Sequence, residues 1–118
     1  MRDHTKLRAF ILADELALII YKLTTKFPKE EIFGLTSQMR RCAVSVPSNI
    51  VEGGARESQT EYFRFWEIAF SSLKELEYQF GLAYRLGYLA EISFNETELK
   101  LTETGKVLSA LIRVLRKP

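Results

Sequence analysis

Apolar side chains recur at alternating spacings of three and four along residues 66–87, and this pattern constrains the fold more than any other feature. The members of the pattern are Trp66, Ala69, Leu73, Leu76, Phe80, Ala83 and Gly87. The spacing places them on one face of an α-helix as a continuous heptad seam. A helix with such a face needs partner helices to cover it. No segment reads as a credible strand, so the sequence predicts an all-α protein.

The same helix has a clear beginning. Ser58-Gln59-Thr60-Glu61 is a capping box, in which the serine and glutamate side chains satisfy each other's free backbone N–H groups. Three further amphipathic segments predict helices, over residues 6–25, 35–54 and 95–117. Asn95 is the expected start of the last one, because asparagine is a favourable N-cap.

Proline and glycine mark the boundaries of these segments. Pro28 ends the first helix, because the residue before a proline avoids the helical region, and residues 29–34 form a connector with room for one helical turn. Gly53-Gly54 is a stop signal for the second helix. Pro47 lies inside that helix and removes one backbone hydrogen bond. It predicts a kink or, alternatively, a break at Val46.

Four helices with short connectors predict a single domain over residues 1–118, an antiparallel up-down-up-down four-helix bundle with a kinked second helix. The hydrophobic share of 47% and the charged share of 27% are ordinary for a globular domain.

Residues 1–6 do not resemble a signal peptide, and Asp14 and Glu15 interrupt the first apolar run. The single cysteine, Cys42, excludes an intramolecular disulfide and fits a reducing compartment. We therefore expect a cytoplasmic protein that does not span a membrane.

Residues that could carry catalysis are scarce. His4 is the only histidine, Cys42 sits among apolar residues, and there is no Glu-x-x-His pair for a di-iron site. Gly53-Gly54 does not follow a strand, so it is not a phosphate-binding loop. These observations predict no enzymatic activity, no cofactor and no metal site.

A polar stripe runs along the second helix at steps of three and four. It consists of Arg41, Ser45, Asn49, Glu52 and Arg56. Asn49 also falls on that helix's apolar seam, where a buried amide must be hydrogen-bonded. The amide could fix the register between helices. Alternatively, Ser45, Pro47, Asn49 and Glu52 could form a polar motif that faces a partner.

Basic residues gather around the second helix and the end of the first, although the net charge is only +2. The candidates for contact with nucleic acid or a partner are Arg40, Arg41, Arg56, Arg64, Lys22 and Lys26. One interpretation is ion pairing with nearby glutamates, which contributes little at a surface. The other is contact with phosphate groups, for which arginine has a favourable bidentate geometry.

Aromatic residues are frequent in the third helix. They include Tyr62, Phe63, Phe65, Phe70, Tyr78 and Tyr84. They could stack on bases, but their helical spacing favours a core or a subunit interface. The apolar faces of the first and third helices are wider than one bundle needs, which predicts self-association.

Several of these segments resemble a known family. They are Gln38-Met39-Arg40-Arg41, Ser45-Val46-Pro47-Ser48-Asn49-Ile50-Val51-Glu52-Gly53, Glu61-Tyr62-Phe63-Arg64-Phe65 and Ser72-Leu73-Lys74-Glu75-Leu76-Glu77. In this order they resemble the bacterial four-helix-bundle proteins encoded within intervening sequences of 23S ribosomal RNA genes. Val51 stands where that family commonly has alanine, and Ser71 where it commonly has glycine.

That family is similar to the accessory protein of diversity-generating retroelements, a homopentameric ring that works with a reverse transcriptase and binds nucleic acid. The resemblance implies a homopentamer with a basic surface and no established enzymatic activity. We therefore expect a non-catalytic oligomeric scaffold that binds RNA or DNA. The alternative is a protein-interaction adaptor that docks a partner such as a reverse transcriptase without touching nucleic acid.

Overall fold

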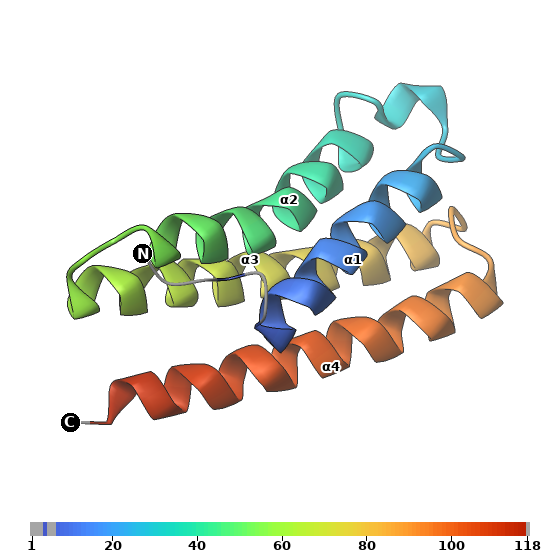
Figure 1. Cartoon of the computed structure of the whole chain (residues 1–118). Coiled ribbons are helices and arrows are strands. Elements are labelled where there is room, and N and C mark those ends of the chain that lie inside the picture. The colour runs from blue at the N-terminus through green and yellow to red at the C-terminus, as the bar shows by residue number, and fades with distance from the viewer. Residues whose placement is uncertain (1–3, 5–6, 118) are drawn as a thin grey trace.

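The protein folds into four long α-helices, seen in a computed structural model that describes residues 4 and 7–117 of the chain. The helices are α1 (Arg8–Thr24), α2 (Leu35–Gly54), α3 (Gln59–Arg85) and α4 (Glu91–Arg116), and a single 3₁₀ turn, η1 (Lys29–Glu31), lies between α1 and α2. Each helix packs against two neighbours, so the four close into an antiparallel bundle (Figure 1). The prediction of an all-α bundle is confirmed.

The seam of α3 lies at the centre of the core. Its six large and small apolar residues from Trp66 to Ala83 are all buried. Gly87 does not belong to the seam, because it is exposed beyond the helix end, where its φ of +84° lets the chain turn towards α4. Ser58 caps the start of α3 as predicted, since its Oγ accepts a hydrogen bond from the Glu61 N–H at 3.2 Å.

The second helix continues without interruption through Pro47, so the alternative of a break at Val46 is wrong. In Figure 1 the ribbon of α2 changes direction near its middle, as expected where a proline removes one hydrogen bond. Both glycines at its end lie within the helix. A Cβ atom on Gly53 would stand 2.9 Å from the Cβ of Phe65, so this glycine permits the close approach of α2 and α3.

The fourth helix begins one turn earlier than the sequence predicted. It starts at Glu91, with Ala90 as its cap, and not at Asn95. The added turn places Phe94 against α3, where its ring stacks on Tyr84 at 4.1 Å and on Phe80 at 5.2 Å between centroids. This packing stabilises helical structure in the four residues that precede Asn95. The polar cap signal at Asn95 therefore does not mark the start of the helix.

The aromatic surface expected on the first half of α3 is mostly covered within the single chain. Tyr62 is buried, and Phe63, Phe65 and Phe70 are half-buried. The exposed apolar side chains lie mainly elsewhere, on α1, on α4 and on the connector between α1 and α2. Self-association stays a prediction, but the surface available for it differs from the one expected on α3.

The connector is held in place by Glu31. One carboxylate oxygen accepts a hydrogen bond from the Leu35 N–H at 3.0 Å, and the other accepts one from the Tyr88 hydroxyl at 2.8 Å. These two bonds keep the pKa of Glu31 below its usual range, and the bond to Glu31 raises the pKa of Tyr88. Glu31 thus caps α2 and ties the connector to the segment between α3 and α4.

Candidate nucleic-acid interface

The middle of the α2 polar stripe faces α3. The Ser45 hydroxyl lies 2.8 Å from the Ser72 hydroxyl of α3, so the two side chains form a polar contact between the helices. The Asn49 amide donates to Ser45, to its carbonyl at 2.7 Å and to its hydroxyl at 3.0 Å. The contact that can fix the register between α2 and α3 is therefore the serine pair. Asn49 does not reach α3 in this contact, but it holds the Ser45 side chain through a hydrogen bond within α2. Pro47 is buried and Glu52 is exposed, so the four residues of the polar motif do not form one partner-facing site.

The half-buried side chain of Arg40 is bonded to the end of α1. Its Nε donates to the Thr24 hydroxyl at 2.8 Å, and an Nη donates to the Tyr21 carbonyl at 3.3 Å. Its guanidinium also lies 4.7 Å from the centroid of the Tyr21 ring. These contacts place a cation at the C-terminal end of α1, where the helix dipole favours it. Within the described residues Arg40 forms no ion pair, and its contact with phosphate stays a prediction.

Arg41 and Arg56 are exposed and have partners on the same surface. Arg41 donates to the Gln38 side chain at 2.5 Å and lies 3.8 Å from a carboxylate oxygen of Glu75. The guanidinium of Arg56 lies 5.0 Å from the ring centroid of Phe65. Contacts of this kind at a surface contribute about 0–1 kcal/mol each, so both side chains can exchange them for an external anion.

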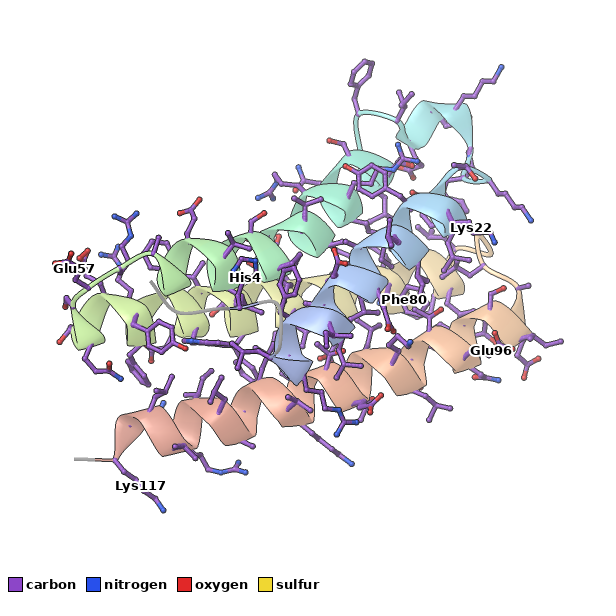
Figure 2. All side chains as sticks on the ribbon, viewed as in Figure 1. His4, Lys22, Glu57, Phe80, Glu96 and Lys117 are labelled. Atoms are coloured by element: carbon purple, nitrogen blue, oxygen red, sulfur yellow. The ribbon has the colours of Figure 1, made fainter. Side chains whose placement is uncertain are left out.

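The structure does not bring the six predicted basic residues together. Lys22 and Lys26 are exposed on the last turns of α1 and just after it, and Arg56 follows α2 beside the start of α3. Figure 2 shows Lys22 and Glu57, the residue that directly follows Arg56, at opposite ends of the molecule. A single subunit therefore has no one patch made of all the predicted residues.

A basic groove that the sequence interpretation missed runs between α3 and α4. We call it the α3/α4 groove. It consists of two adjoining hollows of about 520 and 320 Å³, which share Phe70, Ser109 and Arg113. Its charged lining comprises the cations Lys74, Lys106, Arg113 and Arg116 and the carboxylates Glu67 and Glu77.

The pairing within this groove leaves positive charge available. Lys74 lies 3.3 Å from Glu77, and Arg116 lies 4.0 Å from Glu67, both at partly exposed positions. Arg113 donates to the Ser109 hydroxyl at 3.3 Å. Within the described residues, neither Lys106 nor Arg113 takes part in an ion pair. The groove therefore carries more positive than negative charge.

Packing of the two helices shapes the bottom of the groove. Gly105 of α4 is buried, and a Cβ atom there would lie 3.6 Å from the Leu73 side chain and 3.8 Å from the Glu77 carboxylate. Hydroxyl groups of Thr102 and Ser109 line the same hollow. The groove thus combines ammonium, guanidinium and hydroxyl groups, all of which can donate hydrogen bonds to phosphate oxygens.

Arg64 is the one predicted arginine that lies beside this groove. It lines a shallow hollow on α3 that shares Glu67 and Ser71 with the groove. The signal that could have identified the groove is at the end of the sequence, where no acidic residue follows Glu103 while four basic residues do: Lys106, Arg113, Arg116 and Lys117. Arg113 and Arg116 also lie in the last turn of α4, where the helix dipole favours basic residues.

The remaining candidates for chemistry are unpromising. Cys42 is buried, and burial together with the nearby Glu75 carboxylate raises the pKa of its thiol, which disfavours the reactive thiolate. Within residues 4 and 7–117, no cluster of histidine, cysteine and acidic side chains could hold a metal ion. In the same part of the chain, no helix has the length and hydropathy needed to cross a membrane.

Comparison with known proteins agrees with the fold. The family model described as 23S rRNA-intervening sequence protein matches residues 5–110. The fold is similar to the crystal structure of a Bacteroides thetaiotaomicron protein of unknown function from the S23 ribosomal protein family. That likeness has a TM-score of 0.80 and 23% sequence identity, and it covers 89% of this chain and 95% of the other. A search of curated proteins finds no match. Since the family model spans most of the sequence, the chain belongs to the 23S rRNA-intervening sequence protein family.

Proposed function

We propose that this protein is a non-catalytic, oligomeric scaffold that binds the phosphate backbone of RNA or DNA along the α3/α4 groove. The observation that carries the proposal is the charge of that groove, in which four cations face two carboxylates. Backbone contacts of this kind give affinity without sequence specificity and weaken as salt rises. The family's association with an intervening sequence of 23S rRNA makes RNA the first ligand to test.

Self-association is part of the proposal because one subunit presents only a modest basic surface. A closed ring would repeat the groove in every subunit, and several weak contacts would then act on one nucleic acid. The pentamer implied by the family resemblance is one such ring. The proposed assembly is cytoplasmic and needs no cofactor.

A protein-interaction adaptor is the second candidate, and the outer face of α1 and α2 supports it. This face exposes the apolar side chains of Ile11, Leu18, Tyr21, Val44 and Val51. Leu18 is 69% exposed, and an apolar face of this kind is typical of protein interfaces. A partner such as a reverse transcriptase could dock there without direct contact between this chain and nucleic acid.

Binding of labelled single-stranded RNA and DNA at two salt concentrations tests the proposal. The variant K106E/R113E reverses two charges in the groove, and we expect it to weaken binding at least tenfold. The matched control R41E/R85E makes the same change at two exposed positions outside the groove and should weaken binding much less. Equal losses in both variants, or no salt-dependent binding by the natural protein at micromolar concentration, would contradict the proposal.

A further inference from the structure

The connector between α1 and α2 presents an isolated apolar tip. Phe33 is 94% exposed, more than any other large apolar side chain of the described residues, and the adjacent Ile32 is 56% exposed. The neighbouring Glu30 is also exposed and, within the described residues, forms no ion pair. The tip therefore offers an aromatic ring and a carboxylate at the surface of the subunit.

The tip is rigidly held. Glu31 is bonded to both the Leu35 N–H and the Tyr88 hydroxyl, so the connector is fixed on both sides. A Cβ atom at Gly34 would stand 2.6 Å from the Glu31 carboxylate oxygen that accepts from Leu35, so a larger residue there would displace this oxygen. An aromatic side chain presented by a preorganised turn loses little entropy on binding, as in the anchor residues of protein interfaces.

A groove of matching character lies between α1 and α4. This α1/α4 groove has a volume of about 600 Å³, and Ile19 and Leu23 contribute its apolar lining. Its polar lining comprises Lys22, Thr25, Lys26, Ser93, Glu96, Thr97 and Lys100. Lys100 is paired with Glu15 at 2.5 Å, whereas Lys22 and Lys26 form no ion pair within the described residues. Figure 2 shows Lys22 and Glu96, which lie on its two sides, at the same end of the bundle.

We propose that the Ile32–Phe33 tip of one copy docks into the α1/α4 groove of a second copy. The apolar lining accepts the phenyl ring, and the ammonium groups of Lys22 and Lys26 face the carboxylate of Glu30. Because Phe33 is almost fully exposed, it does not occupy the groove of its own chain. The inference rests on the oligomeric part of the proposed function and names the two surfaces that meet.

This contact gives Lys22 and Lys26 a role in assembly and leaves nucleic acid to the α3/α4 groove. The variant F33S removes the anchor at a position that makes no core contact, and we expect it to lower the mass in light scattering at micromolar concentration. The control L99S changes an equally apolar residue of α4, 75% exposed and outside the groove, and should leave the mass unchanged. Circular dichroism verifies that both variants remain folded.

A charge exchange tests the pairing of the two surfaces. Sedimentation equilibrium should show that E30K and K26E each weaken self-association at least fivefold, and that E30K/K26E restores it. Single variants that both weaken association without recovery in the double variant would overturn the contact, as would an unchanged mass for F33S. A natural protein that is monomeric would also overturn it.

RNA binding measured on the same samples separates this inference from the proposed function. Loss of RNA binding by K26E with an unchanged mass would overturn the contact and assign Lys26 to nucleic acid. If F33S lowers the mass while the natural oligomer binds no RNA, the contact stands and the nucleic-acid proposal fails. If F33S remains oligomeric while K106E/R113E loses RNA binding, the contact between the tip and the α1/α4 groove is overturned and the nucleic-acid proposal stands.

Discussion

Arg40 of α2 donates a hydrogen bond to the Thr24 hydroxyl of α1, and Thr24 in turn donates to the Ile20 carbonyl at 2.7 Å. The arginine therefore closes the last turn of α1 through a buried threonine. Of the two adjacent arginines that the sequence marks as equivalent, one stabilises the bundle and the other, Arg41, faces solvent. This difference can be measured.

Replacing Arg40 should reduce stability and leave nucleic-acid affinity unchanged. R40A removes hydrogen bonds from a charged donor and exposes the end of α1, so we expect a loss of about 1–3 kcal/mol in the free energy of unfolding. R41A is the matched control, with an expected loss of about 0–1 kcal/mol. Urea unfolding followed by the fluorescence of Trp66, the single tryptophan, measures both. Equal stabilities for the two variants would show that the contact of Arg40 with α1 is unimportant.

Gly53 should not tolerate a methyl group. G53A places a Cβ atom 2.9 Å from the Cβ of Phe65, and forcing the two helices apart should cost about 1–3 kcal/mol. Gly81 lies inside α3, and a Cβ atom there would meet no neighbouring atom within 4 Å. G81A should therefore be neutral or stabilise by roughly 0.5–1 kcal/mol through helix propensity. The midpoint of thermal unfolding should therefore fall for G53A and stay unchanged or rise for G81A.

Acid should weaken the connector through Glu31. Because the pKa of Glu31 is lower in the folded chain than in the unfolded one, its stabilising contribution is complete above the unfolded value of about 4.3. That contribution is lost as pH falls through the folded pKa. E31Q should therefore be less stable than the natural protein at pH 7, and the difference should shrink below about pH 4. Chemical unfolding at a series of pH values measures this, and a constant difference would rule out the carboxylate as the cause.

Tyr88 supplies the complementary effect at high pH. Its pKa is raised, mainly by the hydrogen bond to Glu31, so its contribution is complete below the unfolded value of about 10 and is lost as pH rises through the folded pKa. Y88F removes only the hydroxyl and keeps the ring, whose centroid lies 5.3 Å from the centroid of the Phe27 ring. We expect Y88F to abolish this alkaline loss. A spectrophotometric titration of the tyrosines should lack one late-titrating group in the variant.

The contact between Ser45 and Ser72 should appear as a coupling energy. A double-mutant cycle of S45A, S72A and the double variant should give about 0.5–1.5 kcal/mol of interaction, the usual range for one neutral hydrogen bond. N49A should reduce this coupling, because Asn49 donates to the Ser45 hydroxyl. Additive effects of the two serine substitutions would show that the hydroxyl contact does not link the helices.

The salt dependence of RNA binding should show which residues of the α3/α4 groove contact phosphate groups. If Arg113 contacts a phosphate, R113A should lower the slope of log affinity against log salt by about one unit per bound site. R40A should leave the slope unchanged, because that side chain is bonded to the end of α1 and lies outside the α3/α4 groove. An unchanged slope for R113A would remove Arg113 from the interface.

The sequence alone determined the helical class, because heptad spacing and a capping box act locally and need no knowledge of neighbours. The seam of α3 from Trp66 to Ala83 and the cap at Ser58 follow from such patterns, whereas the sequence left open whether the second helix continues through Pro47. Family membership was also visible in short motifs around Asn49 and Glu61. The start of α4 was not, because the stacking of Phe94 on Tyr84 outweighs a polar cap signal.

Only the tertiary structure decided what each charged side chain does. Arg40 and Arg41 are adjacent in sequence, yet one turns towards α1 and the other towards solvent and Glu75. The α3/α4 groove joins side chains from two different helices, and no local pattern reveals that Lys74 and Lys106 share one hollow. The physical reason is that helix formation depends on residues within a turn or two, whereas the partners of a charge depend on which faces the packed helices bring together.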